Sequence, residues 1–392
     1  MQLFAGKNWR PAVRAWSPDR AQVEDLRGLA TAVPAFYRAL EKCYFAFDWV
    51  RAFYDRGKPP ALVAHQTSRA VQGVLPPVLR PDLLITEQGF VLCELDSVPG
   101  GIGVTASLER EFLAGTRVPE AFFNSFAGTA KTAVVAVSDE SAVYRPEMEY
   151  LLAGTGVRLV RAEELQVTEQ GVFADGVPVD VVYRFFELFD LPNLGDCAKL
   201  PQAVERGLVK VLPPMRPFQE EKLSLALFWH PRLENFWREQ IPAADLALLK
   251  KLVPETWIVG DETAFPPRLE NLTQKERARW VLKASGFSPL AWGSRSVVIG
   301  ADVPAARWER ELAAIKKNEK IFYVCQRYRK PCRVPGVAGD GAMARVRICP
   351  YYFKGGNAFF WAGTLATFCP PDKKIIHGMS VASLTCAAVP AG

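Results

Sequence analysis

Residues 78–103 read VLRPDLLITEQGFVLCELDSVPGGIG and contain the pattern from which the fold is inferred. Two apolar runs, 78–86 and 90–95, are separated by the polar segment 87–89, which ends in a glycine and is typical of a turn. A cluster of glycines at 99–103 closes the stretch. This pattern predicts two antiparallel strands joined as a β-hairpin.

Each predicted strand carries two charged residues on one face, because residues two apart on a strand point the same way. Arg80 and Asp82 share a face of the first strand. Glu94 and Asp96 share a face of the second. Hairpin pairing can bring these faces together, which places three carboxylates beside one guanidinium. Such a cluster repels itself unless a hard cation is present, and its oxygen atoms suit Mg²⁺ bound together with ATP phosphates. The alternative is two solvated strand faces with a surface salt bridge.

Two lysines stand at positions suited to phosphate binding. Lys222 begins an apolar helical segment. Lys283 ends an apolar strand and precedes a turn at Ser285 and Gly286, so its ammonium group and the backbone N–H groups of the turn can face one phosphate. For a single lysine, a surface side chain with its charge in water is the commoner role.

A further flexible segment contains Gly293 and Ser294 and can fold over phosphates, although a plain hairpin turn is the commoner interpretation. The strand predicted over 321–326 turns polar at its end. A base inserted there would find backbone donors and acceptors beside an aromatic wall. Near the C-terminus, Arg345 and Arg347 share a strand face, and Arg345 is predicted as a second anion contact, with a strand-edge charge as the alternative.

Between residues 131 and 190 the pattern changes to alternating strands and a helix, which predicts a compact α/β unit with a parallel sheet. No Gly-x-Gly-x-x-Gly turn follows its first strand, which argues against a protein that holds its ligand in this unit alone. The predicted strands of the chain are 132–137, 157–160, 179–183, 256–259, 280–283, 296–299 and 321–326, and the predicted helices are 19–29, 34–54, 144–152, 220–237 and 305–316.

The composition suits a large globular protein, since 392 residues with 49% hydrophobic and 23% charged residues can form two or three domains. The net charge of +6 is interleaved along the chain, without the basic blocks that bind nucleic acid. No window approaches a membrane span, so the expectation is a cytoplasmic protein with no membrane or nucleic-acid partner. The spacing of its eight cysteines and three histidines does not suggest a zinc site. The composition leaves a homodimer open.

The order of these motifs resembles eukaryotic glutathione synthetase and bacterial glutathionylspermidine synthase, over roughly residues 78 to 390. The resemblance implies a circularly permuted ATP-grasp fold with an inserted Rossmann-like domain. It also implies an ADP-forming carbon–nitrogen ligase whose partners are ATP, Mg²⁺, a carboxylate small molecule or peptide, and an amine. The implied domains are 1–118 for the N-terminal helices and metal-binding strands, 119–200 for the inserted domain, and 201–392 for the main part, with a lid lobe over about 252–325 and a C-terminal lobe over about 326–392.

The resemblance assigns a role to each candidate residue. The resemblance implies that Arg80 faces an acyl phosphate and that Mg²⁺ is bound by Asp82, Glu94 and Asp96. It implies that the ATP phosphates are contacted by Lys222 and Lys283 and covered by Ser285, Gly286, Gly293 and Ser294. It also implies that adenine is surrounded by Cys325, Gln326, Arg327 and Tyr328.

Three positions depart from the family pattern. Asp96 stands where asparagine is common, the segment around Gly293 carries Arg295 and no acidic residue, and alanine follows Lys283 where proline is usual. These departures leave the number of Mg²⁺ ions open. They also keep a second function in view, a nucleotide-binding protein without turnover that has a regulatory or scaffold role.

Overall fold

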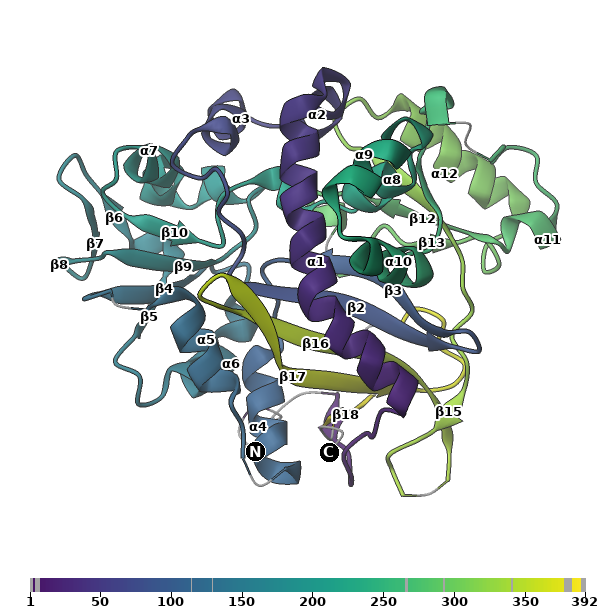
Figure 1. The fold of residues 1–392 in the computed structure, drawn as a ribbon, viewed down its shortest axis with the longest axis horizontal. Helices are drawn as coiled ribbons and strands as arrows, with labels where there is room; N and C mark the ends of the chain where they lie inside the picture. Colours follow the sequence, from purple (N-terminus) through teal and green to yellow (C-terminus); the bar gives the residue numbers. More distant parts are fainter. Residues whose placement is uncertain are drawn as a thin grey trace.

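The computed structural model of the chain describes residue 3 and residues 8–113, 115–128, 130–264, 267–291, 293–339, 341–376 and 383–388. These residues form a mixed α/β fold with several sheets, one of them parallel and four-stranded (Figure 1). The prediction of a mixed fold that contains a parallel sheet is confirmed.

The largest sheet joins segments from the two ends of the chain. The predicted hairpin forms β2 and β3, and its register pairs Arg80 with Asp96 and Asp82 with Glu94. Strand β2 then pairs antiparallel with β16, so C-terminal strands extend the N-terminal hairpin (Figure 1). The order is β1 (Arg10–Pro11), β18 (Leu384–Ala387), β17 (Ala358–Cys369), β16 (Met343–Gly355), β2 (Val78–Thr86) and β3 (Gly89–Asp96), with β15 (Val334–Pro335) on β16.

The parallel sheet lies in the sequence between the hairpin and the lysine motifs. Its central strands are buried on both faces, as expected when helices cover both sides of a parallel sheet, and they are apolar apart from the buried Arg184. Helices α5 (Val118–Phe126) and α6 (Arg145–Leu152) cover one face, and α7 (Leu200–Glu205) covers the other. The strand order is β10 (Lys210–Leu212), β9 (Val181–Phe185), β4 (Ala133–Val137) and β5 (Arg158–Arg161), so the sheet extends past residue 200.

A third, antiparallel sheet lies on the opposite side of the molecule (Figure 1). Trp308 and Leu312 of α12 (Ala305–Lys317) pack on one of its faces against Trp280 and Cys325. Its strand order is β11 (Thr256–Ile258), β14 (Tyr323–Arg327), β12 (Trp280–Ala284) and β13 (Val298–Ile299).

The long helix α1 (Arg20–Ala46) crosses the large sheet (Figure 1). It begins with a capping box between Asp19 and Gln22, and the Tyr352 hydroxyl of β16 donates to its Leu26 carbonyl at 2.6 Å. The sequence predicted two helices with a break before Pro34. That break is wrong, because Pro34 lies inside α1, where burial against the core offsets its missing hydrogen bond.

The remaining elements connect these layers. No helix among the described residues is both long enough and apolar enough to cross a membrane. The remaining helices are α2 (Asp48–Asp55), α3 (Pro60–Thr67), α4 (Ile102–Phe112), α8 (Leu223–Trp229), α9 (Glu234–Gln240), α10 (Ala243–Leu252) and α11 (Gln274–Arg277), and a small sheet contains β6 (Gln166–Val167), β7 (Val172–Ala174) and β8 (Val177–Pro178).

Candidate active site

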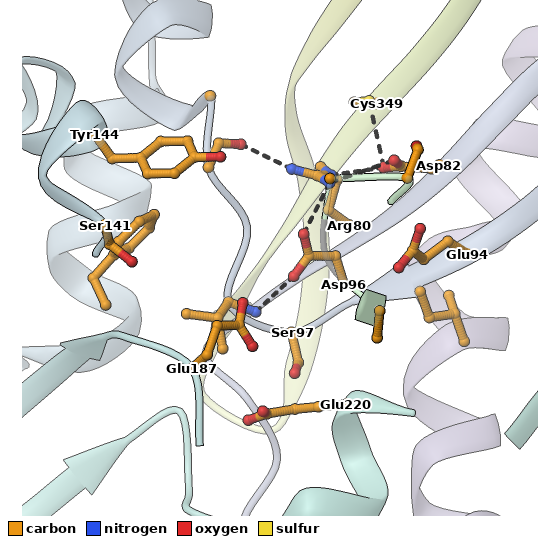
Figure 2. Close-up of a pocket in the computed structure, with 18 of the residues that line it drawn as sticks. Arg80, Asp82, Glu94, Asp96, Ser97, Ser141, Tyr144, Glu187, Glu220 and Cys349 are labelled. Carbon is orange, nitrogen blue, oxygen red and sulfur yellow. Dashed lines mark hydrogen bonds and ion pairs between the residues drawn. The ribbon is translucent and has the colours of Figure 1, made fainter. Parts of the chain in front are cut away.

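A buried ion-pair cluster lies where β2, β3 and β16 meet (Figure 2). Arg80 donates from Nε to Asp82 at 2.7 Å and pairs through Nη2 with Asp96 at 2.8 Å. Its Nη1 donates to the Gly100 carbonyl at 2.9 Å. Arg347 donates to the second oxygen of Asp82 at 3.2 Å. Each nitrogen of the Arg80 guanidinium has a partner, so its plane is fixed.

Glu94, the third carboxylate, pairs with Lys222 at 2.6 Å, and Lys222 also donates to the Ala291 carbonyl at 3.1 Å. The sequence interpretation placed one guanidinium beside the three carboxylates. The structure adds a second guanidinium, that of Arg347 on β16, and brings the predicted Lys222 to the same cluster. Each carboxylate of the cluster therefore has a cationic partner within the protein.

The two aspartates of the cluster have opposite pKa shifts. Burial alone would raise the pKa of Asp82, but the Arg80 and Arg347 guanidiniums outweigh it, so the pKa of this carboxyl lies below its usual range. Burial also raises the pKa of Asp96, and there the single contact with Arg80 does not outweigh burial and the neighbouring Asp82 and Glu94. Asp82 is thus the more strongly ionised of the two.

Two cavities meet at this cluster. Cavity A contains the side chains drawn in Figure 2 and lies toward the parallel sheet, and cavity B lies toward the antiparallel sheet. Residues that line only cavity A include Arg80, Asp96, Ser97, Ser141, Tyr144, Glu187 and Glu220. Residues that line cavity B and not cavity A include Leu84, Val91, Val281, Lys283, Ile299, Gln326 and Tyr328. Both cavities are lined by Asp82, Glu94, Lys222, Ala291, Ser294 and Arg347, which we call the shared wall.

Lys283 connects the two sheets that enclose cavity B. Its ammonium group donates to the Gln326 side chain at 2.8 Å and to the Cys93 carbonyl on β3 at 3.3 Å. Burial lowers the pKa of Lys283. Gln326, Arg327 and Tyr328 also line this cavity, so the structure brings three of the four predicted base-pocket residues together with the predicted lysine.

Cys325 is the fourth residue of that set, and it is fully buried in the core between β14 and α12. Ser285 is buried as well, donates to Glu221 at 2.8 Å and accepts from the Leu223 backbone N–H at 2.8 Å. Neither residue lines cavity A or cavity B, since strand alternation turns the Cys325 side chain toward α12 and the hydrogen bonds of Ser285 hold the turn against α8. Their predicted ligand contacts stay predictions.

The loop residues Gly293 and Ser294 line cavity A, and Ser294 also reaches the shared wall. Gly286 lines cavity A beside Glu221, where a Cβ atom would come within 2.4 Å of the Glu221 Cγ atom. This position therefore requires a residue without a side chain. The predicted role of these residues as a phosphate cover is untested.

Arg345 lies apart from the cluster although it shares a strand face with Arg347. On the N-terminal side of Arg347, the neighbour of β16 changes from β2 to β15. Arg345 borders a separate hollow there, and its guanidinium donates to the Lys373 carbonyl at 2.8 Å. Arg347 is the arginine of β16 that reaches both cavities. The predicted catalytic role of Arg345 is not tested by this placement, but Arg347 suits an anion contact at the cluster better.

The backbone N–H groups of the glycine cluster after β3 are bound by another segment of the chain. The Glu147 carboxylate accepts the backbone N–H groups of Gly101 at 2.8 Å, Gly103 at 3.1 Å and Val104 at 3.3 Å at the start of α4. A Cβ atom at Gly103 would come within 2.2 Å of the Glu147 carbonyl oxygen. This helix terminus is therefore occupied by a carboxylate of α6 and is not free to bind a phosphate.

The sequence did not predict four polar residues that line cavity A, namely Ser97, Ser141, Tyr144 and Glu187. Ser97 directly follows Asp96, and Glu187 follows the carboxyl end of the parallel strand β9. Ligands commonly bind at the carboxyl ends of parallel strands, so the predicted strand 179–183 was a usable signal for Glu187. Tyr144 and Ser141 lie in the same way after β4.

Comparison with known proteins gives no family assignment. No protein-family model matches the chain, and no curated protein matches it. Among solved structures, one similar protein comes from Methylobacillus flagellatus KT and is provisionally named gamma-glutamylcysteine synthetase. It has 13% sequence identity over 83% of this chain and 84% of its own, with a TM-score of 0.49. A likeness at this level assigns neither a fold family nor an activity.

Proposed function

We propose that this chain is an ADP-forming ligase of the circularly permuted ATP-grasp type, which activates a carboxylate with ATP and joins it to an amine through an acyl phosphate. The shared wall is the observation that carries the proposal, because Asp82, Glu94, Lys222 and Arg347 border both cavities. A nucleotide in cavity B and a carboxylate in cavity A would meet there. Phosphoryl transfer between two bound substrates requires such a junction.

Cavity B has the chemistry of a nucleotide pocket. Val281 and Ile299 from the antiparallel sheet and Leu84 from the large sheet give it apolar walls suited to a flat base. Lys222 and Lys283 also line it, and their ammonium groups could bind the phosphates of a nucleotide. Lysine binds phosphates as a compact point charge.

The protein groups around the junction suit phosphoryl transfer. Arg80 and Arg347 can hold a substrate carboxylate, and Lys222 and Lys283 can offset the charge that builds on the transferring oxygens. Closure of the loop at 293–296 would exclude water from the labile acyl phosphate. A neutral amine in cavity A would then attack the acyl carbonyl, with inorganic phosphate as the leaving group.

Mg²⁺ fits this wall best through Glu94. The Glu94 side chain is 39% exposed and pairs with Lys222 through one oxygen, whereas Asp82 and Asp96 are engaged by Arg80. The described residues contain no group of three His, Cys, Asp or Glu side chains placed to hold a metal by themselves. Mg²⁺ in nucleotide sites commonly takes one or two carboxylates plus phosphates and waters, and it would neutralise phosphate charge here. Asp82 and Asp96 as further ligands remain part of the proposal.

Nucleotide binding is the first test. Mg-ATP or Mg-ADP should raise the melting temperature, because a ligand that binds the folded state stabilises it by mass action. Lys283→Gln should weaken nucleotide binding about tenfold or more, since it removes a buried charged donor of cavity B. Lys317→Gln, at the exposed end of α12, is the matched control and should bind as the wild type does.

A melting temperature that is indifferent to the nucleotide would refute the proposal. ADP formation on addition of candidate acids and amines then separates a ligase from a nucleotide-binding protein without turnover. Binding without ADP formation across the panel would favour the second function.

A further inference from the structure

Cavity A is lined by one carboxyl group, that of Glu187, for which the described residues provide no hydrogen-bond or ion-pair partner. Burial, together with the nearby Glu220 and Asp96 carboxylates, raises the pKa of Glu187 to about 8, and the smaller opposing effects of Arg184 and Lys222 do not outweigh them. Every other acidic side chain named on this wall has a partner, since Glu220 pairs with the buried Arg184 and Asp96 pairs with Arg80.

A second polar group at the same place also lacks a partner. Ser97 is 2% exposed and lines cavity A, and its hydroxyl has no hydrogen-bond partner in the part of the chain that the structure describes. Figure 2 shows the Ser97 hydroxyl, Glu187 and Glu220 at the end of the cavity away from Arg80. A buried hydroxyl and a half-buried carboxylate without partners are costly unless a ligand satisfies them.

These groups are acceptors, and together they match an ammonium group. A protonated amine has three N–H donors, which the Glu187 and Glu220 carboxylates and the Ser97 oxygen can accept. At the other end of the cavity, the Arg80 and Arg347 guanidiniums match a carboxylate. Cavity A is therefore polarised, and an ammonium group bound at its Glu187 end would favour the charged form of that carboxyl.

We propose that Glu187, with Ser97 and Glu220, forms a binding subsite for a protonated alkylamine. This inference rests on the proposed function and narrows its substrate class. The ammonium group belongs either to the amine substrate, which then carries a second amino group, or to an acid substrate that also bears an amino group. Both sources share the chemistry of the subsite.

Binding of simple probes tests the subsite without knowledge of the natural substrate. The probes are putrescine, which carries only ammonium groups, γ-aminobutyrate, which also carries a carboxylate, and n-butanol, which has no charge. Their affinities are measured by calorimetry on the full chain in the presence of Mg-ADP. At least one charged probe should bind, and n-butanol should not compete with it.

Substitutions at one position make the test specific. Glu187→Gln should weaken binding of the charged probe about tenfold or more, the scale of a lost charge-assisted hydrogen bond, and Glu187→Asp should restore part of it. Glu169→Gln, an exposed glutamate elsewhere in the same α/β unit, should bind as the wild type does. Glu187→Gln should also raise the melting temperature at neutral pH, because it removes a half-buried carboxyl whose ionisation the folded state disfavours. A structural role for Glu187 would lower it.

The two sources of the ammonium group differ in their dependence on Arg80. Arg80→Lys should weaken γ-aminobutyrate if the amino group belongs to the acid substrate, and it should leave putrescine unchanged. Equal binding to the wild type and Glu187→Gln, failure of both charged probes to bind, or displacement of a bound probe by Mg²⁺ alone would overturn the subsite. The Mg-ADP titration in the same samples shows separately whether the nucleotide proposal stands.

Discussion

Glu94→Gln should lower ADP formation about a thousandfold, the largest effect expected of a single substitution in this protein. Glu94 borders both cavities, and its carboxylate is the one of the cluster with room for Mg²⁺ beside its ion pair with Lys222. Glutamine keeps the shape of the side chain but removes the charge that attracts Mg²⁺ and orients Lys222. Steady-state ADP release with an acid and an amine that support turnover measures the effect.

The fold should survive this change. The Glu94 side chain is 39% exposed and the buried Lys222 keeps its contact with the Ala291 carbonyl, so loss of the ion pair should cost about 1–3 kcal/mol of the free energy of unfolding. Glu87→Gln, at the exposed turn of the same hairpin, is the matched control and should keep wild-type turnover. Retained turnover in Glu94→Gln would remove Glu94 from the mechanism, and an unfolded variant would make Glu94 a structural partner of Lys222 instead.

The sequence predicted those parts of the site that depend on local geometry. Arg80, Asp82, Glu94 and Asp96 come together because a hairpin with side chains alternating between faces pairs them over a short stretch of chain. The same alternation explains a weaker prediction. Side chains alternate along β14, so Gln326 lines cavity B while its neighbour Cys325 packs against α12.

Contacts between distant segments could not be predicted in the same way. Arg347 reaches Asp82 only because β16 pairs with β2, and no local pattern in one sequence specifies which strands become neighbours. The divergence of Arg345 from Arg347 has the same origin, since it depends on where β15 replaces β2 beside β16. The spacing of residues along one strand predicts which face of the sheet each side chain occupies. The pairing of distant strands determines which cavity that face borders.

Glu187 shows a different limit. Its position after a predicted parallel strand could have been noted, but its significance comes from the absence of a partner, which is a property of the folded surroundings. Ser97 is similar, since a serine after a charged strand is unremarkable until its hydroxyl is found buried and without a hydrogen bond.

Arg80→Lys should lower turnover about a hundredfold while leaving affinity for Mg-ATP nearly unchanged, because Arg80 lines cavity A and not cavity B. In the folded protein its three nitrogens contact Asp82, Asp96 and the Gly100 carbonyl. A lysine ammonium is a single point with three donors, so it cannot keep all of these contacts and also donate to a substrate carboxylate. Turnover measured beside an ATP-binding titration gives both quantities.

The same contacts predict a loss of stability, which a purely catalytic residue would not show. Asp82 and Asp96 are partly deprived of their partner in Arg80→Lys, so the free energy of unfolding should fall by about 1–3 kcal/mol. Arg158→Lys is the matched control, because Arg158 pairs with the exposed Asp175 far from the shared wall, and neither turnover nor stability should change there. Arg347→Lys should differ from both variants, since Arg347 borders both cavities and its loss should weaken ATP binding as well as turnover. If Arg80→Lys lost stability but kept full turnover, the guanidinium would only brace the two aspartates, and the carboxylate of the substrate would have to be held by Arg347.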